Sequence, residues 1–235
     1  MLAATTIAGL AALRPAAAAA QYHLAGADLY RIGETPVISR ITYDGTESLT
    51  IARRGSGTRF VAEVECTRTD DEGSSTEHAR FVQDLLPDGS FEDRSDQDPD
   101  FLTVLNQPFA VELDAATIRD LRELHASAPF AAASPLGGGN LTGELRPGIV
   151  GLLAGHRAVG VHFQANGDVS GKLPDSSSTS INGRIHLNGT AYYDAHGALL
   201  LALDATLTVE GTLVEDHFAS IPVQIVYRRV IKVTP

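Results

Sequence analysis

Cysteine is almost absent from this chain of 235 residues, which contains only Cys66. One cysteine excludes an internal disulfide framework, so packing and strand pairing must stabilise the fold. Cys66 shares its alternating position with Phe60, Ala62 and Val64. We therefore expect a buried small hydrophobe at this position and not a reactive nucleophile.

Long hydrophobic runs are also missing, apart from a short Ala-rich stretch at the start. Leu2 to Leu13 is apolar, and Arg14-Pro15 and Ala16 to Ala20 follow it. This pattern is typical of a secretory signal peptide over residues 1–20, cut near Gln21. The alternative is an uncleaved anchor, but the stretch is too short to span ~30 Å of hydrocarbon. We predict an exported protein, periplasmic or extracellular, that is not an integral membrane protein.

Positive charge is scarce, and the formal net charge is -11. Residues 70–100 carry most of the excess, with acidic side chains opposed only by Arg80 and Arg94. A negative field of this kind repels nucleic acid and anionic membrane surfaces. We therefore expect neither nucleic acid nor an anionic membrane surface as a partner.

Recognised catalytic motifs are missing as well. The chain has no G-x-S-x-G, no H-E-x-x-H, no Walker A sequence and no dinucleotide-binding glycine pattern after a strand. Gly137-Gly138-Gly139 lacks the Lys and Ser/Thr of a phosphate loop, which favours a linker. The sequence therefore predicts no catalytic residue and no cofactor.

Metal-ligand patterns fail on spacing. Asp96, Asp98 and Asp100 alternate like the start of a calcium loop, but Phe101 and Gln107 occupy the positions of its Gly and its bidentate carboxylate. A looser cation site and a solvated acidic loop remain as alternatives, of which we favour the loop. His156 and His162 would lie about 20 Å apart on one continuous strand. We predict no metal site.

The strongest pattern present is strict alternation from Ile181 to Val209. Apolar residues hold the odd positions on both sides of Asp194-Ala195-His196-Gly197. This period predicts a long antiparallel hairpin with one buried face. A three-residue loop over 195–197 would keep both apolar rows on that face. The predicted pairs are Tyr193 with Leu199, Ala191 with Leu201, Gly189 with Leu203 and Leu187 with Ala205.

Further strands are expected over 37–43, 47–51, 58–68, 77–86, 109–113, 158–165, 168–173 and 222–233. Asp44-Gly45 and Asn166-Gly167 are typical hairpin turns. An N-cap at Asp114 and a 3.6-residue stripe predict one helix over about 115–127, ended by Pro129. Phe130–Gly139 is expected to be a loop.

These elements predict a mainly β protein with an antiparallel curved sheet, half-barrel or sandwich, and one helix packed on it. Residues 21–235 are expected to form a single domain, with halves over 21–113 and 140–235 as an alternative division. At the level of architecture this resembles the curved-sheet carriers of the bacterial envelope that hold acyl chains. We therefore expect a non-catalytic exported binding protein for a hydrophobic or lipid ligand. Its expected ligand-binding residues are Leu152, Phe163, Leu201 and Leu203.

Two other function classes stay open. One is an envelope scaffold or assembly protein that binds another protein through residues 70–100, with Asp93, Asp96, Asp98 and Asp100 as its charges. The other is a hydrolase without a sequence motif, in which His125 or His156 would meet a carboxylate and a hydroxyl.

Overall fold

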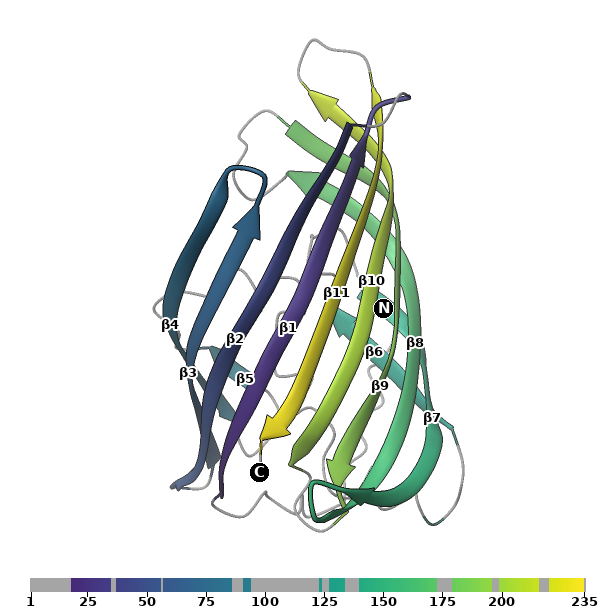
Figure 1. The fold of residues 1–235 in the computed structure, drawn as a ribbon. Helices are drawn as coiled ribbons and strands as arrows, with labels where there is room; N and C mark the ends of the chain where they lie inside the picture. The colour runs from purple at the N-terminus through teal and green to yellow at the C-terminus, as the bar shows by residue number, and fades with distance from the viewer. Residues whose placement is uncertain are drawn as a thin grey trace.

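The computed structural model describes residues 18–34, 37–55, 57–85, 91–93, 123, 127–133, 140–172, 179–195, 199–215 and 220–234. Within these ranges eleven strands form one antiparallel sheet in the order β5-β4-β3-β2-β1-β11-β10-β9-β8-β7-β6 (Figure 1). The strands are β1 (Ala18–Ile32), β2 (Val37–Arg54), β3 (Gly57–Asp70), β4 (Gly73–Leu85), β5 (Phe91–Asp93), β6 (Ala128–Ala133), β7 (Asn140–Leu153), β8 (His156–Lys172), β9 (Thr179–Asp194), β10 (Leu200–Glu215) and β11 (Ile221–Thr234).

The order of strands places the first strand and the last strand side by side in the middle of the sheet. From β1 the strands run outward in sequence order to the edge strand β5; β6 forms the other edge, and the strands from β6 to β11 return to the middle. β1 pairs with β11 from Gln21↔Thr234 to Ile32↔Val223. This long-range ladder joins the N-terminal and C-terminal strands into one continuous sheet.

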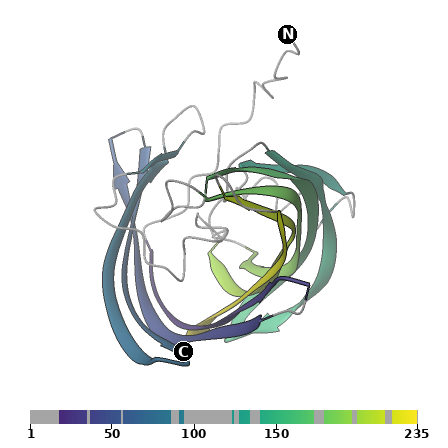
Figure 2. The ribbon, with the colours of Figure 1, turned by 90° about the horizontal axis from the view of Figure 1, so that it is seen from above.

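The sheet is strongly curved, and its core lies on one face. Figure 2 shows the strands wrapping around a common axis, with an inner, concave side and an outer side. The alternation of buried and exposed residues along β3, β9 and β11 follows the two-residue period of a strand with one buried face. The predicted mainly β fold with an antiparallel curved sheet is confirmed, in its single-sheet form.

The predicted hairpin exists as β9 and β10, and both apolar rows lie on the inner face. Its register differs from the prediction by two residues, because Leu203 pairs with Ala191 and Ala205 with Gly189. Tyr193 already pairs with Leu200 in place of Leu199, which is one residue of the difference, and an irregularity between Leu200 and Ala202, where the register shifts, adds the other. A β-bulge of this kind adds a residue to one strand, and sequence alternation alone does not reveal it.

Two predicted turns are wrong. β2 runs straight through Asp44-Gly45, and β8 runs straight through Asn166-Gly167. A Cβ on Gly45 would lie 2.7 Å from the Cα of Cys66, so this glycine allows close approach of β3 and not a turn. The alternation of inward and outward residues continues across both dipeptides, and it predicts the structure better than the two-residue turn motif does.

The segment before the hairpin is also more regular than predicted. Ala128–Ala133, expected to fall in the end of the helix and a loop, forms the edge strand β6, which pairs with β7. The actual turn from β7 to β8 is Ala154-Gly155, where both residues have positive φ. Two positive φ values are the mark of a type I′ turn.

Several predictions fall largely or wholly outside the described residues. The helix over 115–127 is represented only by Glu123, which has helical backbone, and by Ser127. Strand 109–113, Gly137-Gly138-Gly139 and Asp96, Asp98 and Asp100 are not described. In the part of the chain that is described, no helix has the length and apolarity needed to cross a bilayer.

The predicted cleavage site falls inside an ordered strand. Ala18, Ala19 and Ala20 pair with Ile51, Thr50 and Leu49 of β2. A cut near Gln21 would therefore remove three residues of β1. The leader itself stays a prediction.

Candidate functional site

The four predicted ligand-binding residues do not form one group. Phe163 and Leu203 lie in the core of the inner face, whereas Leu152 is 83% exposed at the β7–β8 turn. Leu201 is buried but lies outside the core cluster, since the bulge puts Leu200 in the inner row beside Tyr193. The structure therefore brings together two of the four.

The inner face over β8, β9 and β10 is an apolar wall. Its buried residues alternate along each strand from Val159 to Val169, from Ile181 to Tyr193 and from Leu203 to Val209. Phe163 covers Gly189, because a Cβ at that glycine would overlap the Phe163 ring and lie 2.9 Å from the Cα of Ala205. The space over Gly189 is thus filled by an aromatic ring.

A buried polar cluster interrupts the inner face where β1, β2 and β11 meet. Arg229 is 0% exposed and Asp28 is 2% exposed. Two guanidinium nitrogens of Arg229 donate to the two carboxylate oxygens of Asp28, and the Tyr43 hydroxyl donates to Asp28 Oδ2 at 3.0 Å. This is a bidentate, charge-assisted pair, the strong form of a carboxylate–guanidinium contact.

Aromatic rings enclose the guanidinium. The Arg229 Cζ lies 4.7 Å from the Tyr43 ring centroid and 5.9 Å from that of Tyr227. Tyr30 meets Tyr227 edge to face, with ring centroids 6.1 Å apart. Burial raises the pKa of all three tyrosines above the ordinary value of 10.0, and the nearby Asp28 carboxylate adds to the shift. The hydroxyls therefore stay protonated at neutral pH.

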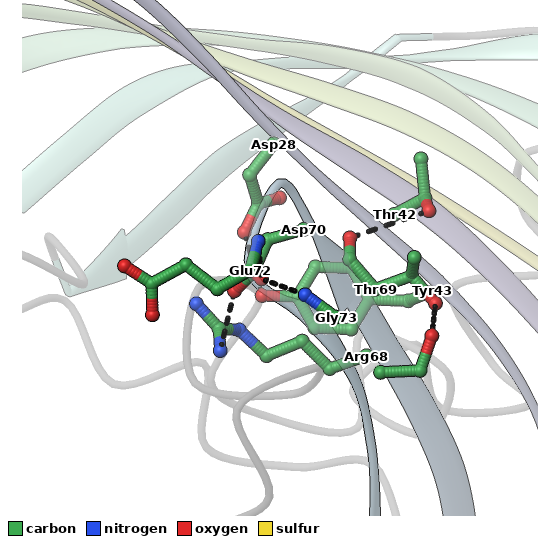
Figure 3. Close-up of polar contacts among 9 residues, drawn as sticks. Asp28, Thr42, Tyr43, Arg68, Thr69, Asp70, Glu72 and Gly73 are labelled. Atoms are coloured by element: carbon green, nitrogen blue, oxygen red, sulfur yellow. Dashed lines mark hydrogen bonds and ion pairs between the residues drawn. The ribbon is translucent and has the colours of Figure 1, made fainter.

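The polar cluster continues toward the β3–β4 turn, drawn in Figure 3. Arg68, which pairs with Tyr43 across β2 and β3, lies 3.0 Å from the carboxylate of Asp70. Asp70 Oδ1 accepts from the backbone N–H groups of Glu72 at 2.9 Å and Gly73 at 3.2 Å (Figure 3). Asp70 thus closes the turn, and the charges of this cluster largely neutralise each other.

Glu47 is a different kind of polar group on the inner face. It lies between Gly45 and Leu49 on β2, opposite Tyr22 of β1 and Val64 of β3. Burial raises the pKa of its carboxyl from 4.5 to about 7. Among the described residues no hydrogen-bond donor contacts this carboxyl, while the Tyr22 hydroxyl donates to the Leu200 carbonyl at 2.9 Å. Glu47 is therefore a half-buried ionisable group on the inner face of β2, next to Tyr22 and Val64.

Cys66 is buried, as predicted. Burial raises the pKa of its thiol to about 11, with a further contribution from the Glu77 carboxylate. A thiol that stays protonated at neutral pH is a poor nucleophile.

The histidines occupy single sites. His156 Nδ1 lies 2.7 Å from Asp194 Oδ2, and His162 Nδ1 lies 2.9 Å from Thr190 Oγ1. Among the described residues, the side chain that His156 bonds is the carboxylate of Asp194. No three His, Cys, Asp or Glu side chains of the described residues gather as ligands of one metal ion. His125, the other histidine considered for hydrolysis, is not described.

An open hollow of about 250 Å³ lies over β7, β8 and β9. Most of its lining is polar and comes from the outward-facing rows of these strands: Glu144, Arg146, His162, Gln164, Asn188 and Thr190. Glu144 and Arg146 already form an ion pair, and His162 is bonded to Thr190. Much of the polar capacity of this hollow is thus satisfied within the protein.

Sequence reasoning missed Asp28, Glu47 and Arg229. A signal exists for Arg229, since it shares the odd parity of the apolar row Val223, Ile225, Tyr227 and Ile231. A charged residue in a buried row predicts a paired or functional group.

Comparison with known proteins gives no family for this chain. No protein-family model matches it, and no curated protein has a significantly similar sequence.

Proposed function

We propose that this protein is a non-catalytic, exported binding protein of the bacterial envelope that holds a hydrophobic or lipid ligand against the inner face of its curved sheet. The observation that carries the proposal is the combination of an apolar wall over β8–β10 with Glu47, a carboxyl that has no hydrogen-bond donor among the described residues. Sites for apolar ligands are mostly hydrophobic and contain a few polar groups that orient the ligand.

The ligand chemistry follows from these two parts. Phe163 and Leu203 supply the apolar contacts, and because they are only 4% and 2% exposed, a ligand that reaches them replaces contacts that they already make within the protein. Glu47 accepts a hydrogen bond when ionised and donates one when protonated. A long acyl chain with a polar head that donates or accepts hydrogen bonds satisfies both parts. The Asp28–Arg229 pair is excluded from this role, because its charges already neutralise each other.

Export is supported by the apolar leader of residues 1–20 alone. The scaffold alternative draws less support from the described residues, since two acids of the 70–100 region act within the fold. Asp70 closes the β3–β4 turn, and Asp84 accepts two hydrogen bonds from Arg59, both at 2.6 Å. The hydrolase alternative has a histidine–carboxylate pair, His156 with Asp194, and among the described residues His156 makes no hydrogen bond with the hydroxyl that a nucleophile would supply.

The test is ligand capture by the purified protein. Native mass spectrometry without detergent should reveal a co-purified lipid, and a fluorescent fatty acid should bind and be displaced by an unlabelled one. Absence of both signals rejects the proposal.

Two neighbouring positions of β10 provide a matched pair of variants. Ala205→Leu enlarges a side chain of the inner face, and Thr206→Leu makes a similar change on the outer face. We expect Ala205→Leu to weaken fatty-acid binding at least fivefold and Thr206→Leu to leave it unchanged. Urea unfolding of both variants separates lost affinity from lost stability.

A further inference from the structure

The β7–β8 turn carries an exposed apolar group that the proposed ligand site does not use. Ile149 is 77% exposed, Val150 is 39% exposed and Leu152 is 83% exposed. These three make up half of the large exposed hydrophobic side chains among the described residues. We call Ile149, Val150 and Leu152 the apolar tip.

The geometry of the hairpin explains why this group is in water. The last pair between β8 and β9 is Ala158 with Asp194. Residues 152–156 therefore extend beyond the last β8–β9 pair, and Arg157 lies at the boundary, where its carbonyl accepts a hydrogen bond from the Ala195 N–H at 2.8 Å. The tight turn at Ala154-Gly155 holds the projection in shape. The tip is thus a short, well-defined hairpin that protrudes from one end of the sheet.

A register shift between Pro147 and Val150 places Val150 and Leu152 on the same side of the hairpin. The shift adds one residue to β7, so Val150 lies opposite Val159, and Leu152 lies opposite Arg157, on the side that faces the core. Ile149 falls within the irregular stretch itself.

The charges around the tip favour a lipid surface. Arg157 pairs with Leu152 in the ladder, is exposed, and has no ion-pair partner among the described residues. Arg146 and His156 lie on the same hairpin, each paired with one acid. A cation beside exposed aliphatic side chains suits anionic headgroups above an acyl layer.

The described acids of residues 70–100, whose charge would repel an anionic surface, lie on β3–β5 and in the β3–β4 turn, away from β7 and β8 in the order of strands. Asp70, Asp71 and Glu72 belong to the β3–β4 turn, at the opposite end of the sheet from Ala154-Gly155 (Figure 1). Exposed charges act over a Debye length of about 8 Å at physiological salt, so the acids of that turn weaken docking at the tip only slightly. A protein partner fits less well, because three side chains are far fewer than a stable interface of about 1,000 Å² requires.

We propose that the apolar tip docks this protein onto a phospholipid surface that carries anionic headgroups, with Ile149 and Leu152 entering the acyl region and Arg157 contacting the headgroups. Leu152 belongs to the inner-facing row and lies at its rim, so docking would place the membrane at one mouth of the inner face. The docking does not depend on what the inner face binds.

A fluorescence experiment tests the insertion directly. The chain contains no tryptophan, so Leu152→Trp introduces a single reporter. With vesicles of phosphatidylethanolamine and phosphatidylglycerol, we expect a blue shift and quenching by brominated acyl chains. Ile38→Trp is the matched control, since Ile38 is 59% exposed at the other end of the sheet. An unshifted Leu152→Trp spectrum, or an equal shift in both variants, overturns the proposal.

Vesicle co-sedimentation of the tryptophan-free protein gives the second readout. Ile149→Glu combined with Leu152→Glu should lower vesicle affinity at least tenfold, because ~1.4 kcal/mol of lost apolar burial is a factor of ten. Ile38→Glu should leave the affinity unchanged. Loss of vesicle binding in the Ile38→Glu control as well as in the double variant contradicts membrane docking. Size-exclusion evidence that the tip instead pairs two copies of the chain contradicts it too. Fatty-acid uptake of the single variant Ile149→Glu, measured in parallel without vesicles, should not change, so this proposal and the proposed function can fail separately.

Discussion

The two wings of the sheet differ in what they place on the inner face. The apolar wing, β7–β10, presents aliphatic and aromatic side chains in its buried rows, from Leu141 on β7 to Val209 on β10. The ionisable wing, β1–β4 with β11, sets Asp28, Glu47 and Arg229 among similar apolar neighbours. Both wings share strand length, pairing and curvature, so the ionisable groups are not needed to form the sheet.

The ionisable groups of the inner face differ in whether they are paired. Burying an ionisable group costs free energy unless it is paired, and the ionisable wing contains both outcomes. Asp28 and Arg229 are paired and tie β1 to β11, whereas Glu47 has no bonded donor among the described residues. We infer that the pair has a structural role and that Glu47 is the better candidate for ligand recognition.

The largest expected effect comes from breaking the buried pair. Arg229→Leu leaves the Asp28 carboxylate buried without its cation, and such losses cost about 3–5 kcal/mol of unfolding free energy. Urea denaturation followed by circular dichroism measures this loss. The neighbouring Arg228→Ala is the control, because its ion pair with Asp204 is exposed and worth less than about 1 kcal/mol.

A double variant sharpens the result. Asp28→Asn combined with Arg229→Leu removes both charges and should recover much of the stability lost in Arg229→Leu alone. If the double variant is as unstable as the single one, shape and not charge compensation dominates at this site.

The second prediction concerns pH and Glu47. The folded carboxyl has a pKa of about 7, against 4.5 for the ordinary value. Below pH 4.5 both states are protonated; between 4.5 and 7 the unfolded chain loses its proton first, so stability falls as pH rises through this window. The full loss is at most about 3 kcal/mol. Glu47→Gln should remove that loss and exceed the wild-type stability at pH 8.

Other carboxylates titrate in the same range, so the informative quantity is the difference in unfolding free energy between wild type and variant at each pH. Glu63→Gln is the control, since Glu63 lies on the outer face of β3 and contacts Arg80 at 2.9 Å. If the difference in unfolding free energy between wild type and Glu47→Gln does not change with pH, the Glu47 carboxyl is hydrated in the folded wild-type protein.

Much of the sheet follows from alternation along single strands. The buried rows of β3, β9, β10 and β11 match the two-residue periods of the sequence. The errors arose where one local signal competed with that period, as with Asp44-Gly45 and Asn166-Gly167, both of which lie inside strands. Bulges near Leu200 and Pro147 shifted the register by mechanisms that alternation does not encode.

The candidate site was less predictable because its contacts join distant parts of the chain. Asp28 and Arg229 are 201 positions apart in sequence, and only the β1–β11 ladder brings them together. The alternation along each strand shows that Asp28 and Arg229 face inward. It does not show that they pair with each other. The exposure of Leu152 could not be predicted either. Nothing in the local sequence pattern indicates that the β7–β8 hairpin extends past the last β8–β9 pair.

The third prediction tests packing in the apolar wing. Gly189→Val places a side chain against the Phe163 ring and the Cα of Ala205, and overpacking of this kind costs about 1–3 kcal/mol. Gly151→Val is the control, because a Cβ at Gly151 meets nothing within 4 Å. Equal unfolding free energies for the two variants would show that the apolar wall has room beside Phe163.

The smallest expected effect concerns the turn that supports the apolar tip. Ala154 has a φ of 49°, a left-handed conformation that costs an L-residue about 1–2 kcal/mol relative to glycine. Ala154→Gly relieves this strain but gives the unfolded chain more freedom, so we expect a net gain of about 0.5 kcal/mol. Gly155→Ala, at a φ of 82°, should lose about 1 kcal/mol although a Cβ there meets nothing within 4 Å. Urea denaturation measures the change in unfolding free energy for each variant. Changes of opposite sign would show that backbone conformation, and not side-chain contact, sets the stability of this turn. Losses in both variants would contradict the type I′ geometry on which the shape of the tip depends.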